Sequence, residues 1–377
     1  MLPRLVLKNK SMLGRWLFLL CFLGFYTCTP DEPITTKGDL EDIEYKPESY
    51  NYIRPDNYPQ LEYSSSNLPT VAGVELGRKL FYDPILSKDS SQGCFSCHKQ
   101  EFAFSNDVAF STGIDGFLGK RSSMSLVDVG FHTRGLFWDG RAADLEEQAA
   151  FPVNDVLELH FNWPDIEKRL QRSNTYPTLF RKAFGIKAKK EITDLLARNA
   201  ISQFERTIVS SGTSKYDRVI AGKDVFDNDE FDGYSMFFDL GEGNPLLPDA
   251  QCAHCHNEPL LSSTSYFNNG LQESYSLTGF KDLGRGGITH DSLDNGKMKV
   301  TTLRNWKYTA PFMHNGSLKT MDDVLAHYSS GGKYSPNRDP LIRQIQLSPT
   351  QLRKLKAFLN TLNDEAILHN PAYSNPN

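Results

Sequence analysis

The sequence predicts a mostly α-helical chain of two units, and three observations point to this fold class. Apolar residues recur at three- to four-residue intervals in several segments, which is the spacing of one helix face, and no run of alternating residues indicates a sheet. A chain of 377 residues is longer than a single hydrophobic core usually grows. One short cysteine motif occurs once in each half, so the two units repeat in plan.

Composition and charge describe an ordinary globular protein. Hydrophobic residues make up 39% of the chain, charged residues 23% and aromatic residues 12%, and the formal net charge is -5. The aromatic rings could line the binding pocket of a large flat cofactor. The charge offers no basic face to nucleic acid, so a nucleic-acid partner is excluded and a charged partner is better matched by a cationic protein.

The first thirty residues have the layout of an export signal. Basic residues from Arg4 to Arg15 precede an apolar run over residues 16–26, which is too short to cross a bilayer comfortably. We therefore predict a signal peptide over residues 1–28 and an exported, periplasmic protein. Cys28 stands where a bacterial lipoprotein carries its lipidated cysteine, so a lipid anchor and an idle cysteine both remain open.

A polar segment over residues 29–68 has no sustained periodicity and is interpreted as a linker. A change of composition at residues 210–214 marks the expected boundary between an N-terminal unit at 69–212 and a C-terminal unit at 213–377. The Gly-, Asp- and Ser-rich segment from residue 268 to 298 is expected to be a long loop. Helical spacing predicts helices beginning near Val71 and over Thr193–Val209, Met321–Tyr328 and Ser348–Leu362.

Each half carries a CxxC pair that is followed directly by histidine. The residues are Cys94, Cys97 and His98 in the first motif and Cys252, Cys255 and His256 in the second. Two thiols one helical turn apart can form thioethers with both haem vinyl groups, while the next residue is directed at the iron. Two disulfides, or a zinc site that brings both motifs together, are the alternatives. Because histidine follows both pairs, we expect two c-type cytochrome domains, each with one covalently bound haem c and with His98 or His256 as its proximal ligand.

Five longer segments carry a family signature. They are LGRKLFYDPILS at residues 76–87, FWDGRAADLEEQ at 137–148, TLRN at 302–305, TAPFMHNG at 309–316 and YSSGG at 328–332. In order and spacing they resemble the bacterial dihaem cytochrome c peroxidase and MauG family over roughly residues 68–362. The resemblance implies an oxidoreductase of the cytochrome c peroxidase type, which reduces hydrogen peroxide to water at the first haem. Electrons would enter through the second haem from a small donor such as cytochrome c.

Two other functions stay open beside the peroxidase. A MauG-like dihaem oxidase would withdraw electrons from a protein residue, and a dihaem electron carrier would have no substrate of its own. The family resemblance also leaves a homodimer open.

The resemblance implies roles for three residues around the first haem. Gln148 and Glu158 would lie in its distal pocket, where Glu158 would move a proton between the two peroxide oxygens. Pro152 matches the proline of that loop. Trp138 would lie between the two haems, where an indole can relay an electron. Without the resemblance, Glu158 would be an exposed loop carboxylate and Trp138 a core aromatic.

The sequence expected around the first haem departs from the family pattern. In the peroxidases that need reductive activation, a histidine shortly after the Ser-x-Gly segment blocks the iron, but Ser111-Thr112-Gly113 is followed by Ile114 and Asp115. His132 is the nearest downstream alternative and falls in a different segment. We therefore predict an open, five-coordinate first iron.

The sequence expected around the second haem also departs from the pattern of the electron-transfer peroxidases. Tyr328 falls where the electron-transfer peroxidases place methionine and where MauG places its axial tyrosine, and phenolate stabilises ferric iron. Met313 and His327 are rival ligands, and His314 is available to support the haem edge.

A calcium ion is the remaining expectation from the family. The family holds it between its domains through backbone oxygens and an asparagine side chain. Thr309 and Pro311 match the backbone positions, whereas Ser122 replaces the asparagine. This replacement weakens the expected calcium site.

Overall fold

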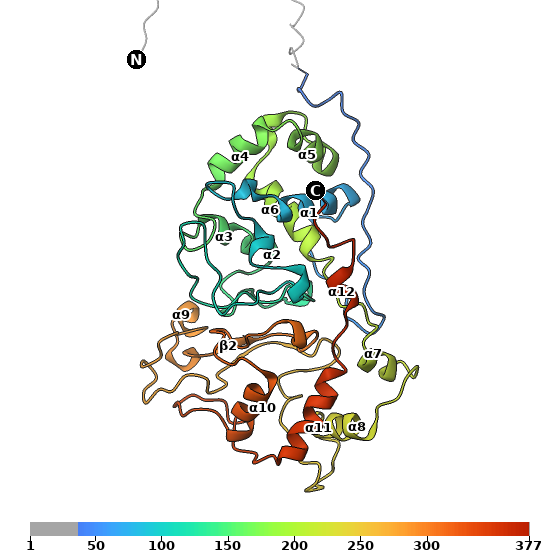
Figure 1. The fold of residues 1–377 in the computed structure, drawn as a ribbon. Coiled ribbons are helices and arrows are strands. Elements are labelled where there is room, and N and C mark those ends of the chain that lie inside the picture. Colours follow the sequence, from blue (N-terminus) through green and yellow to red (C-terminus); the bar gives the residue numbers. More distant parts are fainter. Residues whose placement is uncertain (1–36, 377) are drawn as a thin grey trace, which may run out of the picture. The chain divides into compact units, whose positions relative to one another are not determined.

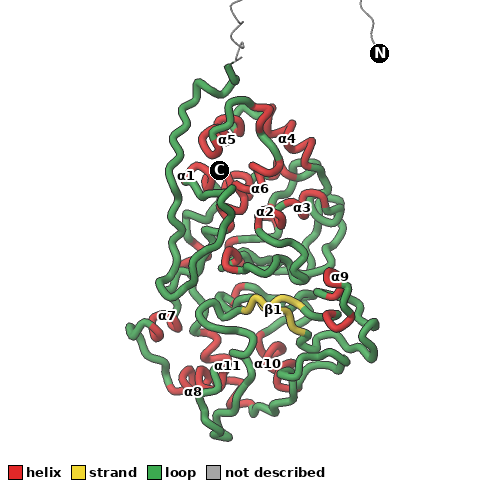
Figure 2. Tube along the Cα trace, turned by 180° about the vertical axis from the view of Figure 1, so that it is seen from behind, coloured by secondary structure: helices red, strands yellow, loops and turns green. Residues whose placement is uncertain are grey.

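The structure is a computed structural model, and it describes residues 37–376 (Figure 1). Helices far outnumber strands in this part of the chain, as the sequence predicts, long loops connect them, and the strands form one two-stranded sheet (Figure 2). No helix among the described residues has the length and apolar character that crossing a membrane requires. The predicted signal peptide and Cys28 lie outside the described residues.

The first half is organised around a close helix pair. Helix α1 (Val71–Tyr82) begins at Thr70, whose hydroxyl accepts a hydrogen bond from a first-turn amide, and it packs along α6 (Asp194–Glu205). A side chain at Gly77 would place its Cβ 1.9 Å from the carbonyl oxygen of Ala200, so this approach of the two helices requires glycine. The other helices of this half are α2 (Leu145–Gln148), α3 (Ala150–Asn154), α4 (Trp163–Arg172) and α5 (Tyr176–Phe184).

The second half contains a similar pair, in which α8 (Asn228–Phe237) packs against α11 (Pro349–Asn360). Ser348 caps α11 by accepting a hydrogen bond from Gln351 N. The other helices and strands are α7 (Lys215–Ile220), β1 (Ser263–Phe267), α9 (Gly286–Thr289), β2 (Met298–Val300) and α10 (Met321–Ser330), with β1 and β2 antiparallel. Short 3-10 turns lie at Pro84–Leu86, Cys94–Ser96, Gln100–Phe102, Val129–Phe131, Lys189–Glu191, Ser292–Asp294 and Trp306–Tyr308.

The four helices that the sequence predicts are present as α1, α6, α10 and α11. The sheet was not predicted, because β2 has three residues that are all buried and therefore shows no alternation. The segment from residue 268 to 298 is irregular over most of its length, as expected, but it also contains the short helix α9.

Residues 38–69, which the sequence suggests to be part of a linker, lie against the rest of the chain. The segment has no helix or strand of its own, and in both views it runs in extended form along the first half towards α7 (Figures 1 and 2). Leu40, Tyr58 and Asn67 are nevertheless buried. Asn67 donates its amide hydrogens to the Glu146 carboxylate and to other groups of the first half. This polar segment is therefore part of the folded unit.

Buried apolar side chains form separate clusters in the two halves, but the C-terminal tail crosses between them. Helix α12 (Ala366–His369) follows α11 and returns to the first half, where Ile367 joins the cluster beside α1 (Figure 1). Arg78 donates to the carbonyl oxygen of Ser374 at 2.7 Å. The expected boundary at residue 212 therefore separates the two apolar cores. The C-terminal tail, however, follows the second core in sequence and packs on the first half.

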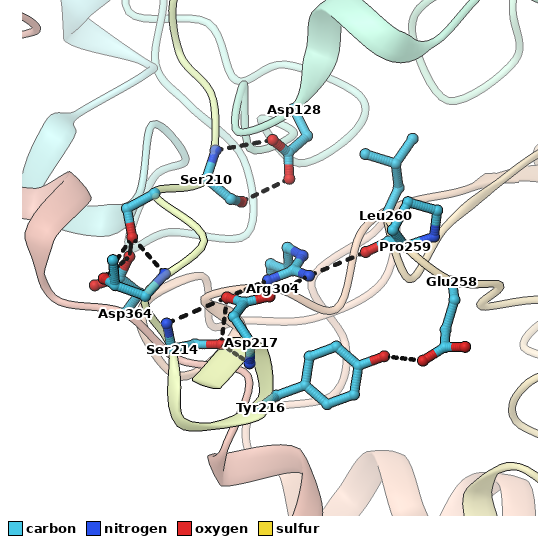
Figure 3. Close-up of polar contacts among 12 residues, drawn as sticks. Asp128, Ser210, Ser214, Tyr216, Asp217, Glu258, Pro259, Leu260, Arg304 and Asp364 are labelled. Carbon is cyan, nitrogen blue, oxygen red and sulfur yellow. Dashed lines mark hydrogen bonds and ion pairs between the residues drawn. The ribbon is translucent and has the colours of Figure 1, made fainter. Parts of the chain in front are cut away.

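A buried polar cluster joins the two halves (Figure 3). Asp128 of the first half accepts hydrogen bonds from both the backbone amide and the hydroxyl of Ser210. In the second half Arg304 makes a two-pronged ion pair with Asp217, at 3.0 and 2.9 Å. The Arg304 guanidinium also lies 5.3 Å from the ring of Tyr58, which comes from the extended N-terminal segment. One buried arginine thus joins the N-terminal segment to the second half, and the charge of Asp128 in the first half acts on it from nearby.

Candidate functional site

The first CxxCH motif forms a tight turn that fixes its histidine. Cys94 accepts hydrogen bonds from the backbone amides of Cys97 and His98, and the His98 Nδ1 atom lies 3.0 Å from the carbonyl oxygen of Phe104. When Nδ1 donates to a carbonyl, Nε2 carries the lone pair that a metal needs. Burial lowers the pKa of His98, which favours the same neutral ring.

The second motif repeats this geometry. The His256 Nδ1 atom lies 3.0 Å from the carbonyl oxygen of Leu261, and burial lowers the pKa of His256 to about 4. All four motif cysteines are free thiols, so the disulfide alternative is wrong. The zinc alternative is also wrong, because the motifs line separate cavities and no group of three His, Cys, Asp or Glu side chains in residues 37–376 is placed to hold a metal ion. The two thiols and the imidazole of each motif instead fit one haem.

A cavity of about 880 Å³ lies beside the first motif. Its wall includes Cys97 and His98 together with Gln148, Glu158 and Trp138. This volume is in the usual range for pockets that hold a cofactor or substrate. The structure therefore brings the three residues predicted for catalysis into the same cavity as His98.

The loop after α3 positions Glu158. Its backbone amide donates to Asp155 O and its carbonyl accepts from Ile114 N, both at 3.0 Å. A Cβ at Gly113 would lie 2.2 Å from Leu157 O, so the neighbouring loop can approach this closely only with glycine. Burial and the nearby Asp155 raise the pKa of Glu158 to about 7, while Arg141 opposes the shift. A carboxyl group with this pKa can both accept and return a proton near neutral pH.

Gln148 is the last residue of α2, which Asp144 caps by accepting a hydrogen bond from Glu147 N at 2.8 Å. Arg141 lies on the same cavity wall and holds its guanidinium 3.5 Å from the centre of the Phe137 ring. These contacts fix the direction from which Gln148 and Arg141 enter the cavity.

The loop in which the family's blocking histidine would occur carries an acidic residue. Asp115 pairs with His160. His132 nevertheless lies on the wall of the first cavity, although sequence reasoning set it aside as part of another segment. Burial lowers the pKa of His132 to about 3, with the positive charge of Lys299 contributing, so its ring is neutral.

A second cavity, of about 200 Å³, lies beside Cys252, Cys255 and His256. Tyr328 and Met313, two of the proposed axial ligands, line this cavity. His314 also lines it.

His327, the third proposed ligand, does not line the second cavity. Its Nε2 atom instead lies 3.0 Å from the carbonyl oxygen of Asn269. The side-chain amide nitrogen of Asn269 lies 3.2 Å from Tyr328 Oη and 3.4 Å from Met313 Sδ. Sequence reasoning missed Asn269, which contacts both remaining ligand candidates.

Trp138 borders both cavities. Its indole nitrogen donates to Ser122 O at 2.8 Å, its carbonyl oxygen accepts from Lys299 N at 2.8 Å, and its ring centre lies 6.3 Å from that of His314. The indole is thus held from both halves, on the wall of both cavities.

Ser122, which replaces the family's calcium-binding asparagine, contacts the second half directly. Its hydroxyl donates to Met313 O at 2.8 Å, and its backbone amide donates to His314 O at 2.7 Å. Thr309 lines the second cavity, and its hydroxyl donates to Trp306 O. The residues fit calcium poorly, because the asparagine amide oxygen is missing and the serine hydroxyl is directed at a carbonyl.

Comparisons with known proteins find a family model and related sequences. Residues 71–225 match the family model described as di-haem cytochrome c peroxidase. Cytochrome c551 peroxidase of Nitrosomonas europaea is 32% identical over 290 residues, which cover 77% of this chain and 79% of that protein. Methylamine utilization protein MauG of Methylorubrum extorquens is 28% identical over 353 residues, which cover 93% and 94% of the two chains.

Solved structures share the fold. A MauG-like protein associated with microbial copper homeostasis superposes with a TM-score of 0.79 at 29% identity, covering 87% of this chain and 99% of that one. The diheme peroxidase BthA of Burkholderia thailandensis has the same fold at 19% identity, with a TM-score of 0.67.

Proposed function

The chain belongs to the dihaem cytochrome c peroxidase and MauG family, and on this premise we propose that it reduces hydrogen peroxide to water in the cavity of His98. Membership makes it an oxidoreductase of the peroxidase type with haem cofactors. In the proposal, electrons enter through the cavity of His256 from a small donor such as cytochrome c. The observation that carries the proposal is that Glu158, a half-buried residue whose pKa is raised to about 7, shares one cavity with His98 and Gln148.

Two haems c would be attached one to each motif. Cys94 and Cys97 would bind the first, and Cys252 and Cys255 the second, which divides the chain into a peroxidatic domain at 69–212 and an electron-transfer domain at 213–377. Bound haem supplies redox-active iron that exchanges electrons with peroxide and with the donor. The free thiols and the carbonyl-bonded Nδ1 atoms support this assignment.

Glu158 would carry out the proton transfers. Its carboxylate would accept the proton of one peroxide oxygen and return it to the other oxygen, which leaves as water. Each peroxide molecule takes up two protons and two electrons and yields two waters. Gln148 would orient the peroxide by hydrogen bonding, because its side-chain amide offers both a donor and an acceptor. Trp138 would relay electrons, which its position on the walls of both cavities supports.

The first iron is proposed to be open, so that peroxide binds without prior loss of a ligand. The absence of histidine from residues 111–118 supports this proposal. An absorption spectrum of the fully oxidised protein should contain a high-spin component. A spectrum with low-spin haem alone would contradict it, and His132 would then be the ligand to replace first.

A MauG-like oxidase is the second candidate, and Tyr328, which lines the cavity of His256, favours it. A phenolate ligand would favour the ferric second haem and so hinder electron entry. Mixing the oxidised protein with peroxide and then with reduced cytochrome c separates the candidates. Rapid, repeated oxidation of cytochrome c supports the peroxidase. A long-lived spectral change without turnover supports the oxidase, and no spectral response would leave only an electron carrier.

Export to the periplasm, with or without a lipid on Cys28, is proposed from the first 28 residues alone. Mass spectrometry of the mature protein purified from its membrane and soluble fractions would identify the N-terminal residue and any attached lipid.

A further inference from the structure

Arg121 lies where the two halves meet and binds a carboxylate of each. Its Nε and Nη2 atoms donate to the two oxygens of Asp282, from the second half, at 2.8 and 2.7 Å. Its Nη1 atom donates to Asp139, from the first half, at 2.5 Å. A forked guanidinium pair fixes direction as well as distance, which a point charge does not. Arg121 thus holds one segment of each half in a defined position relative to the other.

The three charged groups are largely shielded from water. The side chains of Asp139, Arg121 and Asp282 are 7%, 19% and 26% exposed. Burial acts to lower the pKa of Arg121, but the hydrogen bonds and charges of Asp282 and Asp139 outweigh burial and raise this pKa. The guanidinium therefore stays charged, and water competes less for its contacts than it does for those of an exposed pair.

The loop that Arg121 holds through Asp139 carries Trp138. Phe137, the residue before Trp138, has a φ of 64°, in the left-handed region that a residue with a side chain rarely adopts. Such a conformation persists only where the surroundings hold it. Arg141 also bonds to Asp139, at 3.2 Å, but it belongs to the same loop and moves with it. Arg121 lies outside this loop and therefore fixes the loop relative to the rest of the protein.

The backbone next to Arg121 sets the direction of the indole. The Trp138 indole nitrogen donates to Ser122 O at 2.8 Å. The Trp138 carbonyl oxygen accepts from Lys299 N, which fixes the backbone of the loop but not the direction of the ring. Because residues 121 and 122 are adjacent, a shift of Arg121 also moves the acceptor of the indole N–H. The side chain of Arg121 and the carbonyl after it thus act on the same loop.

Asp282, which accepts the forked pair, has contacts of its own that fix it in the second half. The side-chain amide of Gln272 bonds to both the backbone amide and the carbonyl oxygen of Asp282, each at 3.0 Å. The amide of Gly284 donates to the Asp282 carboxylate at 2.9 Å. Arg121 is therefore held by a carboxylate that is itself well fixed.

We propose that Arg121 is a positioning residue for Trp138, and that its contacts with Asp282 and Asp139 set the place and direction of the indole on the wall of the two cavities. This inference rests on the proposed function, in which Trp138 relays electrons. Electron transfer slows steeply as the distance between a relay and its partners grows, so a small displacement of the indole is enough to slow it. Arg121 also lines the first cavity, so a test must separate positioning from a direct action on peroxide.

The test compares Arg121→Met, Asp282→Asn and the control Arg198→Met in the protein with both haems attached. Arg198 has a similarly shielded side chain, 18% exposed, and pairs with Asp194 at 2.7 Å, but it lines neither cavity. Stopped-flow mixing of the reduced protein with peroxide separates two steps. The rate of the peroxide reaction depends on the peroxide concentration, whereas the rate of electron transfer between the haems does not.

We expect Arg121→Met and Asp282→Asn to slow the electron transfer about 10- to 100-fold, the order that a small misplacement costs. The rate constant of the peroxide reaction, the haem content and the spectrum of each haem should stay those of the wild type. Arg198→Met should match the wild type in both steps. If Arg121→Met does not accumulate, Asp282→Asn replaces it, because it breaks the forked pair from the other side and keeps the shape of the side chain.

A double variant tests whether Arg121 acts through Trp138. Trp138→Phe should slow the electron transfer, and adding Arg121→Met should slow it no further, because residues that act as a unit have non-additive effects. Independent effects that multiply in the double variant would overturn the inference. Unchanged electron transfer in Arg121→Met with full haem content, a slower peroxide reaction in this variant, or equal slowing in Arg198→Met would also overturn it.

Failure of the proposed function gives different results. Trp138→Phe with wild-type electron transfer would remove the relay, and the role of Arg121 would fall with it. A wild-type protein with fewer than two covalent haems, or without turnover of peroxide, would contradict the proposed function before any variant is compared. The inference alone fails where Trp138→Phe slows the electron transfer and neither Arg121→Met nor Asp282→Asn does.

Discussion

The side-chain amide of Asn269 donates a hydrogen bond to the phenolic oxygen of Tyr328 across 3.2 Å. Burial raises the pKa of Tyr328 to about 12, and this hydrogen bond acts in the opposite direction. The same amide nitrogen lies 3.4 Å from Met313 Sδ, so one residue holds both candidate ligands of the second haem. A side chain that moves to the iron loses its hydrogen bond with Asn269. The candidate ligand with the weaker hydrogen bond loses less, so Asn269 favours its binding to the iron.

Replacing Tyr328 by phenylalanine should change the spectrum of the second haem and leave that of the first unchanged. Phenylalanine keeps the ring that fills the cavity but removes the oxygen that would bind iron. Electronic absorption and electron paramagnetic resonance of the oxidised protein report the change. Asn269→Leu, which removes the donor, should shift the same spectral features less. If Tyr328→Phe has a wild-type spectrum, the phenol is not the ligand and Met313→Leu becomes the decisive variant.

Replacing Glu158 by glutamine should lower kcat/KM for peroxide about 10²- to 10⁴-fold, because a positioned acid/base contributes on this order. Haem content and the oxidised spectrum should stay close to the wild type. Stopped-flow measurement of the reaction with peroxide gives the rate. Glu75→Gln, at an exposed position on α1, is the matched control and should react like the wild type. A fully active Glu158→Gln protein would remove this residue from the proton transfer.

The rate of reaction with peroxide should rise with pH and level off above about pH 7. The pKa of Glu158 is raised to about 7, so the carboxyl is mostly protonated below that pH and cannot accept the first proton. Each further unit of acid should slow the step about tenfold. Arg141→Leu should move the inflection to higher pH, because Arg141 lowers the pKa of Glu158. The same inflection in Glu158→Gln would assign it to another group.

Replacing Arg304 by methionine should lower the free energy of unfolding by about 3–5 kcal/mol, because it leaves Asp217 buried without its partner. Denaturant unfolding followed by far-ultraviolet circular dichroism measures the change. Lys356→Met breaks an exposed pair with Asp322 and should cost only about 0–1 kcal/mol. Equal effects of the two substitutions would show that the buried Arg304–Asp217 pair of Figure 3 contributes no more to the free energy of unfolding than the exposed pair does.

Local sequence signals predicted the parts of the fold and site that depend on short spacings. The four named helices follow from apolar periodicity, and the geometry of His98 and His256 follows from the spacing within each motif. Glu158 could be predicted because its loop carries a recognisable family pattern. In each case the signal and the structure involve neighbouring residues.

Contacts between distant segments could not be read in this way. Asn269 meets Tyr328 across 59 positions, and β2 is too short for its burial to leave a periodic pattern. His327 was a rival ligand only because it adjoins Tyr328, yet adjacent helical residues point about 100° apart, so one faces the cavity and the other does not. The polar segment 38–69 likewise gave no sign that Tyr58 would be buried beside Arg304.

Because the C-terminal tail packs on the first half, the core of that half is complete only after the end of the chain has docked. Residues 366–376 cover α1 and the turn after the first motif, where Gln100 donates to Ile367 O and Tyr82 donates to Tyr373 O. During folding the first half stays partly uncovered until these last residues have docked on it. A nascent chain that stopped after α11 would expose an apolar surface beside Phe81 and Phe104, which a protease could recognise as unfinished.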